Sequence, residues 1–442
     1  MIFLLYRILA ALSAAALAPY YAVRAWRCGE PVATLGERLG RVSPEIVARA
    51  SRSAGRTIWI HAVSVGEVLA AVALAEGLKR RLGDCAIFVS TTTETGRQLA
   101  RERLTCADGI FYFPWDSVGG VRRALRSIRP AAVIVMETEI WPNFLREARR
   151  GGVPVVFANA RISERSFARF KSWKSLVGEL FAQAMRDAEV FLAQTPEDAA
   201  RLIEMGAEEE QVTVTGNLKY DVAPPAMGEF GSWLAEQIRA QERWPVLVAG
   251  SVLGLEEDAV LAGYDLVQRQ FRRTLLVLAP RKPDRFDEAA KIAAEGGWNV
   301  IRRSQVKLDA ALNESADILV LDSIGELAGL YSLADAVFVG GSLVPAGGHN
   351  ILEPAWFVKP PVFGPSMDNF RAMAAQFLAA RAAVEVSSGQ QLGKVWLQLI
   401  EDKPLSERMG KAARELCERN RGATERALDA IAGVLGARER RA

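Results

Sequence analysis

The chain alternates short apolar runs with longer amphipathic stretches, and this alternation constrains the fold more than any other feature of the sequence. Each run holds four to eight residues and is rich in Val, Ile and Phe, as are the buried strands of parallel sheets. Helical patterns such as 67–81 and 164–187 separate the runs. The first set of predicted strands is 58–65, 86–92, 131–137, 154–158, 190–194 and 212–215. This β-α-β order predicts a doubly wound parallel sheet.

The alternation breaks once and then starts again. Residues 222–243 contain Pro224-Pro225, Gly228 and Gly231, followed by a short polar helix that ends before Pro245, and this segment predicts a linker. The second set of predicted strands is 245–250, 274–279, 317–321, 336–340 and 361–363. We therefore expect two Rossmann-like α/β domains, with ligands bound where the carboxyl ends of the strands face an intervening cleft. The expected division is 24–221 for the N-terminal domain, 222–243 for the linker, 244–404 for the C-terminal domain and 405–442 for a helical tail.

The N-terminal segment 1–23 predicts a membrane anchor. Residues 8–23 carry no charge, although a spanning helix needs about 20 apolar residues and this segment is marginal. The alternative is a cleaved signal peptide with its site at Ala16-Leu17-Ala18, but Pro19 would hinder cutting. Basic residues stay on the cytoplasmic side, so we expect a retained anchor with the large body in the cytoplasm. The arginines that indicate this orientation are Arg24, Arg27, Arg38 and Arg41, against Arg7 alone on the other side.

The composition excludes several classes of protein. Of the 442 residues, 50% are hydrophobic and 24% are charged, which excludes a disordered chain and a polytopic membrane protein. The net charge of +3 carries no strong nucleic-acid signature. Four scattered cysteines and two histidines make a Cys/His zinc site or a disulfide scaffold improbable, and they fit a reducing compartment.

Polar residues stand at the ends of three predicted strands in the first half of the chain. Glu67 follows a strand and a glycine and opens a helix, where it either faces a ligand or merely favours the helix dipole. Glu137 and Glu139 end a buried strand, which is costly unless they are hydrogen-bonded or functional, and they could hold a divalent cation. Lys219 lies on a Gly-Asn turn, a position that is more often solvated surface.

The second half carries a glycine-rich segment, 340–354, with two Gly-Gly pairs. Such pairs let backbone N–H groups approach a phosphate or a sugar closely. Glu353 begins a helix and could accept hydrogen bonds from two adjacent hydroxyls, as a ribose presents them. Arg281, between two prolines before another helix, predicts an anion site. Neither a Walker loop nor a G-x-G-x-x-G fingerprint occurs, which disfavours ATPases and dehydrogenases.

Together these segments resemble the 3-deoxy-D-manno-octulosonic acid (Kdo) transferases that build the inner core of lipopolysaccharide. The matching segments follow the family order and cover nearly the whole chain. They are Gly36-Glu-Arg-Leu-Gly40, His61-Ala-Val-Ser-Val-Gly-Glu67, Met136-Glu-Thr-Glu-Ile-Trp-Pro-Asn143, Asn159-Ala-Arg-Ile-Ser163, Val214-Thr-Gly-Asn-Leu-Lys-Tyr-Asp221, Ile324-Gly-Glu326 and Gly340–Pro354.

The resemblance implies a glycosyltransferase-B fold and an inverting transfer of Kdo from CMP-Kdo to a tetra-acylated lipid A precursor at the cytoplasmic face of the inner membrane. It implies Glu67 as general base, with Glu137 and Lys219 supporting the transition state. Glu37, Arg38 and Arg41 are expected on the acceptor side. No metal or other cofactor is expected, because cationic side chains can offset the charge on the departing phosphate. The expected nucleotide contacts are Pro280, Arg281, Ile324, Gly325, Glu326, Asn350, Ile351, Leu352 and Glu353.

Some residues depart from the family pattern, and other functions remain open. Segment 250–254 lacks a Thr-His pair, Lys282 stands where histidine is usual, and Glu94 stands where proline is usual. These differences concern the details of how the donor is bound, and not the type of reaction. The alternatives are another nucleotide-sugar transferase or epimerase of the same fold, a non-catalytic membrane-tethered binding protein, and an exported periplasmic sugar-binding protein.

Overall fold

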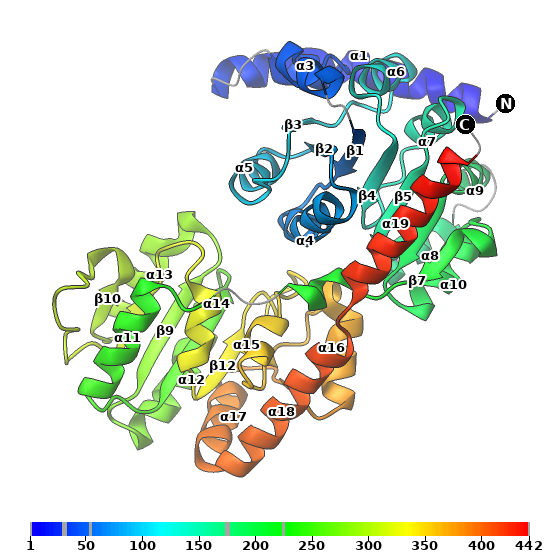
Figure 1. Ribbon diagram of the computed structural model, residues 1–442. Coiled ribbons are helices and arrows are strands. Elements are labelled where there is room, and N and C mark those ends of the chain that lie inside the picture. The colour runs from blue at the N-terminus through cyan, green and yellow to red at the C-terminus, as the bar shows by residue number, and fades with distance from the viewer. Residues whose placement is uncertain (1, 29–32, 53–54, 173–176, 223–225, 441–442) are drawn as a thin grey trace. The chain divides into compact units, whose positions relative to one another are not determined.

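The chain folds into two compact units, each built on a parallel sheet (Figure 1). The computed structural model describes residues 2–28, 33–52, 55–172, 177–222 and 226–440. The N-terminal unit comprises residues 1–222 and 420–442, and the C-terminal unit comprises residues 223–419. Each unit contains a seven-stranded sheet. The prediction of two parallel-sheet α/β domains is confirmed.

The N-terminal sheet has the strand order β3-β2-β1-β4-β5-β6-β7, and its strands all pair in parallel. Its strands are β1 Arg56–His61, β2 Cys85–Thr91, β3 Gly109–Tyr112, β4 Ala132–Met136, β5 Val155–Ala160, β6 Val190–Ala193 and β7 Val212–Val214. The six strands expected from the sequence are present. Strand β3 is not among the predicted strands; it begins at Gly109 and is followed by Pro114, residues that are typical of turns.

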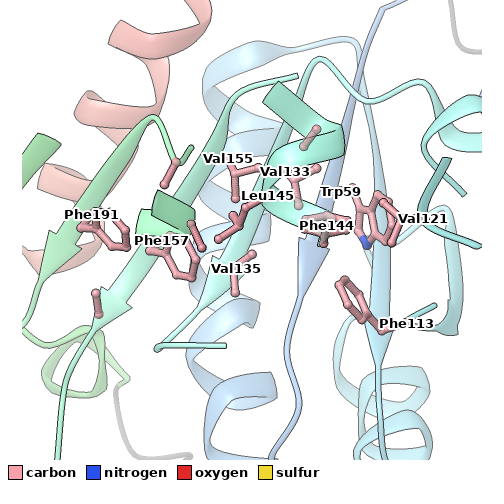
Figure 2. Packing of buried hydrophobic residues seen from close by; sticks show 14 of the residues in the cluster. Trp59, Phe113, Val121, Val133, Val135, Phe144, Leu145, Val155, Phe157 and Phe191 are labelled. Atoms are coloured by element: carbon pink, nitrogen blue, oxygen red, sulfur yellow. The ribbon is translucent and has the colours of Figure 1, made fainter. Parts of the chain in front are cut away.

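Helices cover both faces of the N-terminal sheet. Helices α3, α6, α7 and α9 pack on the face that Figure 2 shows, around Trp59, Phe144 and Phe157. Helices α4, α5 and α19 cover the other face. The predicted helix 164–187 consists of α8 and α9, and residues 173–176 lie outside the described residues. The helices of this unit, besides α1, are α2 Ala33–Arg38, α3 Pro44–Arg52, α4 Val65–Leu82, α5 Glu94–Arg103, α6 Val118–Ile128, α7 Pro142–Arg150, α8 Glu164–Ser172, α9 Val177–Arg186, α10 Pro196–Glu204 and α19 Ala423–Glu439.

The C-terminal sheet has the order β10-β11-β9-β8-β12-β13-β14. Its strands are β8 Val246–Val252, β9 Leu275–Pro280, β10 Val300–Arg302, β11 Ile318–Val320, β12 Ala336–Val339, β13 Val362–Phe363 and β14 Val384–Glu385. Helices α12, α13 and α17 pack on one face, and α11 and α14 on the other. Strands β10 and β14 are not among the predicted strands; they lie at the two edges of this sheet. The helices are α11 Glu229–Ala240, α12 Glu257–Gln270, α13 Phe286–Glu295, α14 Leu327–Leu330, α15 Leu352–Trp356, α16 Arg371–Ala379, α17 Gly389–Glu401 and α18 Lys403–Arg419.

The structure divides the chain differently from the sequence at the expected linker and tail. Most of 222–243 is helix α11, whose Phe230, Trp233 and Leu234 lie in the core of the C-terminal unit. The short helix expected here is therefore present, but burial of its three large apolar side chains makes it part of the C-terminal unit and not of a polar linker. The expected tail 405–442 is shared, because α18 belongs to the C-terminal unit and α19 to the N-terminal unit.

Helix α1 Ile2–Cys28 lies along the N-terminal unit. Arg7 forms an ion pair with Glu147 of α7 at 2.8 Å, and the Tyr6 hydroxyl donates to Asp116 at 2.7 Å. Leu4, Leu5, Ile8, Leu9 and Leu12 are exposed. Across the described part of the chain, no helix combines the length and hydropathy that crossing a bilayer requires.

Replacement of Leu428 by alanine is expected to lower the free energy of unfolding of the N-terminal unit by about 2–5 kcal/mol, because it leaves a cavity between α19 and α4. Leu428 is 1% exposed, and its side chain packs directly against Gly77 of α4. Urea unfolding of the full chain measures the loss. The control is Asp429→Ala on the same helix, whose exposed ion pair with Arg81 contributes about 1 kcal/mol or less. Equal losses in both variants would contradict this packing.

Candidate functional site

The carboxyl edge of the N-terminal sheet brings together Glu67, Glu137 and Lys219. Glu67 lies in the first turn of α4 after β1, Glu137 follows β4 directly, and Lys219 lies in the short 3-10 helix after β7. A Cβ added at Gly66 would stand 3.9 Å from the Lys219 ammonium, so the lysine lies beside the first turn of α4. The grouping follows from parallel strands, which all end at one edge.

Glu67 is both a capping residue and a carboxylate with a raised pKa. Its Oε2 accepts from the Val63 N–H at 2.8 Å and its Oε1 from the Ser64 N–H at 3.2 Å, while the Ser64 hydroxyl caps the Glu67 N–H. Glu67 therefore does stabilise the start of helix α4. Burial, with the negative charges of Glu137 and Glu139, nevertheless raises the pKa of Glu67 to about 7 against these hydrogen bonds. A carboxylate with a pKa near 7 is suited to take a proton at neutral pH.

Glu137 is held by two cations. Lys219 Nζ lies 3.3 Å from Glu137 Oε1, and Arg161 Nε lies 3.1 Å from Oε2. Strand β4 ends at Met136, and Glu137 adopts a left-handed backbone with φ of 55°. A non-glycine residue in this conformation costs about 1–3 kcal/mol and is often found at functional sites. Because both of its oxygens are bound by cationic side chains, Glu137 is poorly suited to the divalent-cation role that the sequence left open.

The turn that carries Lys219 is fixed by the buried Asn159 and the partly buried Asp221, which sequence reasoning did not select as site residues. The side-chain oxygen of Asn159, itself at φ of 60°, accepts from the Leu218 N–H at 3.0 Å. Asp221 accepts from the backbone N–H groups of Gly422 and Thr424, both at 2.6 Å. The start of α19 therefore braces the lysine turn from 201 residues away in the chain. In the sequence, Asn159 and Asp221 are marked only by their place in the motif segments 159–163 and 214–221.

His61, the other titratable group at the end of β1, is not available as a base at neutral pH. The ring is fully buried and stacks on Phe113 with ring centroids 3.9 Å apart. Its Nδ1 lies 3.1 Å from the carbonyl oxygen of Ser90. Burial lowers the pKa of His61 to about 4, so the enclosed ring is only a weak proton acceptor. This leaves Glu67 as the better base on this strand end.

The predicted acceptor-side residues occupy the same edge of the sheet, near the ends of β2 and β3. Glu37 is buried, accepts from the Tyr112 N–H at 2.9 Å and pairs with Arg97 at 3.4 Å. Arg38 donates to the Thr92 carbonyl at 2.9 Å, and its guanidinium lies 4.3 Å from the centre of the Tyr112 ring. Arg41 is exposed. Glu37 and Arg38 therefore stabilise this edge through hydrogen bonds to the backbone after β2 and in β3, and Arg41 offers an exposed positive charge.

In the C-terminal unit, the glycine-rich segment after β12 groups Asn350 and Glu353 with Arg281. The Asn350 side chain caps α15 through the Leu352 N–H at 3.1 Å and donates to Glu353 Oε1 at 3.3 Å. Burial raises the pKa of Glu353, while this hydrogen bond and the charge of Arg281 oppose the rise. Ile351 and Leu352 are buried, so their side chains support the loop. The arrangement offers a carboxylate, an amide and a guanidinium at one strand edge.

The other predicted nucleotide contacts lie at neighbouring strand ends of the same sheet. Pro280 ends β9, and the Arg281 N–H donates to the Val252 carbonyl at 2.8 Å, which leaves the exposed Arg281 side chain to project from the edge. Ile324 is exposed and Gly325 has φ of 92°. The Glu326 carboxylate forms an ion pair with Arg303 at 3.0 Å. Glu326 is therefore already held by a cation from the segment after β10, a contact that the sequence did not indicate.

Comparison with known proteins identifies the family. The family model for 3-deoxy-D-manno-octulosonic-acid transferase (kdotransferase) matches residues 33–222. The 3-deoxy-D-manno-octulosonic acid transferase of Haemophilus influenzae is 33% identical over 86% of this chain and 87% of the relative. That of Bordetella pertussis is 34% identical over 90% and 91%. The chain belongs to the Kdo transferase family. It is thus a glycosyltransferase of lipopolysaccharide biosynthesis, as its sequence motifs implied.

The similarity extends to the fold of solved structures. The crystal structure of Anabaena Alr3699/HepE in complex with UDP superposes with a TM-score of 0.56 at 14% identity, over 86% of this chain and all of that chain (100%). The putative UDP-N-acetylglucosamine 2-epimerase of Listeria monocytogenes gives 0.55 at 13% identity, over 86% and 96%. These two likenesses show the fold alone. The family match in the N-terminal unit spans every candidate residue at its sheet edge, from Glu37 to Lys219.

Glu137→Gln is expected to lower the pKa of Glu67 below about 7, because the negative charge of Glu137 is one of the causes that raise it. The carbon-13 shift of the Glu67 carboxyl, titrated in protein labelled at glutamate Cδ, measures this pKa, and Glu67→Gln assigns the signal. Glu164→Gln is the control, since Glu164 pairs with Arg201 at 3.8 Å and its charge is not among the causes that raise the pKa of Glu67. A pKa of Glu67 near 4.5 in the unmodified protein would show that burial and the neighbouring carboxylates do not control its ionisation.

Proposed function

We propose that this Kdo transferase moves Kdo from CMP-Kdo to a tetra-acylated lipid A precursor, with inversion at the anomeric carbon. The observation that carries the proposal is the buried Glu67 carboxylate with its pKa near 7, beside a lysine that is fixed by a second carboxylate. Such a pair provides one proton acceptor and one positive charge at the same strand edge. A single base with direct displacement inverts the reacting centre.

The reaction needs little more than these groups. As the acceptor hydroxyl attacks, its proton passes to a Glu67 oxygen and its oxygen forms the new bond to the anomeric carbon. The bond from that carbon to the phosphate oxygen breaks, and CMP leaves with the electron pair. Lys219 offsets the charge that grows on the departing phosphate, and Glu137 holds the lysine in place. Because CMP is a good leaving group, no metal is required for this step.

The donor proposal rests on the strand edge of the C-terminal unit. Arg281 would bind the CMP phosphate, and Glu353 with Asn350 would accept and donate hydrogen bonds at the ribose. Backbone groups near Gly325 and Ile351 would border the cytosine ring of CMP. The two oxygens of Glu353 suit adjacent hydroxyls, which ribose presents and deoxyribose does not. This arrangement supports a ribonucleotide-activated sugar as donor.

The acceptor proposal rests on helix α1. Phe3, Tyr6 and Arg7 contact the body of the N-terminal unit: the Arg146 guanidinium lies 3.9 Å from the centre of the Phe3 ring. Large exposed apolar side chains recur on another side of the helix at i, i+1, i+4, i+5 and i+8, and they are Leu4, Leu5, Ile8, Leu9 and Leu12. We propose that this side lies in the cytoplasmic surface of the inner membrane, as interfacial helices do. The exposed arginines of α6 (Arg122, Arg123 and Arg126) would face anionic lipid headgroups.

Glu67→Gln is expected to lower the turnover of CMP-Kdo with the lipid A precursor by about 10²–10⁴-fold, the usual contribution of a general base. Glutamine still caps the helix through its oxygen, so the fold is retained, but it takes no proton at neutral pH. In the unmodified enzyme kcat/KM should fall about tenfold per pH unit below about 7, since the base is active only when deprotonated. Mass analysis of the lipid product measures both effects.

The matched control is Glu197→Gln, an exposed glutamate in the first turn of α10 after β6. It should leave turnover within about twofold, a range expected of an exposed surface substitution. Near-normal turnover of Glu67→Gln would refute the base assignment. Turnover with UDP-sugars and none with CMP-Kdo would replace the proposed donor.

The double variant Leu5→Asp and Leu9→Asp is expected to weaken binding to vesicles of phosphatidylethanolamine and phosphatidylglycerol by at least about tenfold, because each leucine contributes roughly 1.5–3 kcal/mol on burial in the apolar phase. Vesicle co-sedimentation measures the change. Leu255→Asp, at an 84% exposed leucine of the C-terminal unit, is the control. Unchanged vesicle binding of the double variant would exclude α1 as the membrane-binding surface.

A further inference from the structure

A fully buried carboxylate lies at the carboxyl edge of the C-terminal sheet, apart from the candidate nucleotide contacts. Glu256 stands between β8 and α12 and is 0% exposed. Its Oε1 accepts from the N–H groups of Ser342 at 2.9 Å and Leu343 at 2.8 Å. Its Oε2 accepts from those of Gly341 at 2.6 Å and Leu253 at 2.9 Å. One carboxylate thus satisfies four backbone donors, which uses all of its lone-pair sites.

These bonds tie the loop after β8 to the glycine-rich loop after β12. Three consecutive N–H groups, 341–343, converge on one anion, and Gly341 has φ of 67°, a conformation that glycine adopts readily. A neutral side chain at position 256 would leave several of these buried donors unsatisfied, at a cost of about 1–3 kcal/mol each. The shape of the loop therefore depends on the charge of Glu256.

The constraint passes on to the residues proposed to bind the nucleotide. The Gly348 N–H donates to the Gly341 carbonyl at 2.7 Å. A Cβ at Gly341 would lie 2.7 Å from the His349 ring, so the loop packs directly against the residue before Asn350. Asn350 in turn caps α15 and binds Glu353. A displacement of Gly341 would accordingly move the Asn350 and Glu353 pair.

We propose that Glu256 is a positioning residue for nucleotide binding: it sets the backbone of 341–343 before the ligand arrives, and so holds the loop that presents Asn350 and Glu353. The proposal rests on the proposed function, in which this loop binds the CMP part of the donor. Glu256 makes no contact with the ligand, because its side chain is enclosed and its oxygens are occupied. Its effect is to reduce the ordering that binding requires.

The chain offers a close control in the next residue. Glu257 is also a buried glutamate, 1% exposed, at the first position of α12. Its carboxylate binds Arg285 at 3.0 Å, and within the described part of the chain it accepts no hydrogen bond from the glycine-rich loop. Substitution of Glu257 by glutamine therefore tests the loss of a buried charge at the same place in the fold, without the loop contacts.

The experiment is isothermal titration of the full chain with CMP. Glu256→Gln is expected to raise the Kd for CMP by about tenfold or more with unchanged stoichiometry, because an amide nitrogen replaces an acceptor facing N–H donors. Glu257→Gln should change the Kd by less than about threefold. Glu256→Asp, which keeps the charge but is one methylene shorter, should lie between the two. In kinetics, the KM for CMP-Kdo should rise while kcat at saturating donor stays within about threefold.

Each outcome separates the proposal from its alternatives. If the unmodified chain does not bind CMP, the proposed function fails. If it does bind, equal Kd values for Glu256→Gln and the unmodified chain overturn the positioning role, and so does a lower stoichiometry with an unchanged Kd, which indicates misfolded protein. If neither Glu256 variant folds, hydrogen exchange of the unmodified chain decides: slow exchange at 341–343 before CMP is added supports the proposal, and fast exchange overturns it.

Discussion

The ion pairs of Glu137 with Lys219 and Arg161 hold together the carboxyl edge of the N-terminal sheet, where the candidate site lies. They join the end of β4, the end of β5 and the turn after β7 through a single carboxylate. Charges at strand ends that are only partly hydrated are stable only when they are paired. The left-handed backbone of Glu137 is retained because both partners fix the side chain that this backbone presents. Lys219 gains a defined position from the same contacts.

The carboxylates of this protein differ in how many hydrogen bonds they accept, and this difference separates their roles. Glu256 accepts four backbone N–H bonds, and Asp221 accepts two short ones at the start of α19, so both act as ties between segments. Within the part of the chain that the structure describes, Glu67 accepts two backbone N–H bonds; it is buried near other negative charges, and its pKa is about 7. A carboxylate with unused acceptor sites and a raised pKa can bind a proton near neutral pH.

Helix α19 shows how a structural element serves the site without contributing a side chain to it. It packs on α4, which carries Glu67, through Leu428 and Ile431. Its first residues donate to Asp221, two positions after Lys219. The C-terminal segment thus supports both the base and the lysine. The sequence predicted a helical tail here, but the apolar pattern of a helix does not specify which sheet it covers.

The sequence determined the class of fold and the family, because buried parallel strands are local apolar runs and the motifs at their ends are contiguous. It also selected Glu67, Glu137 and Lys219 through the resemblance of contiguous motifs to the family, because position at a strand end alone left their roles open. The tertiary structure alone decided that α11 joins the C-terminal core, that Arg161 shares Glu137 with Lys219, and that Glu256 binds a loop 85 residues away. The physical reason is that a buried charge is stabilised by whichever donors surround it in space, and no local pattern records those partners.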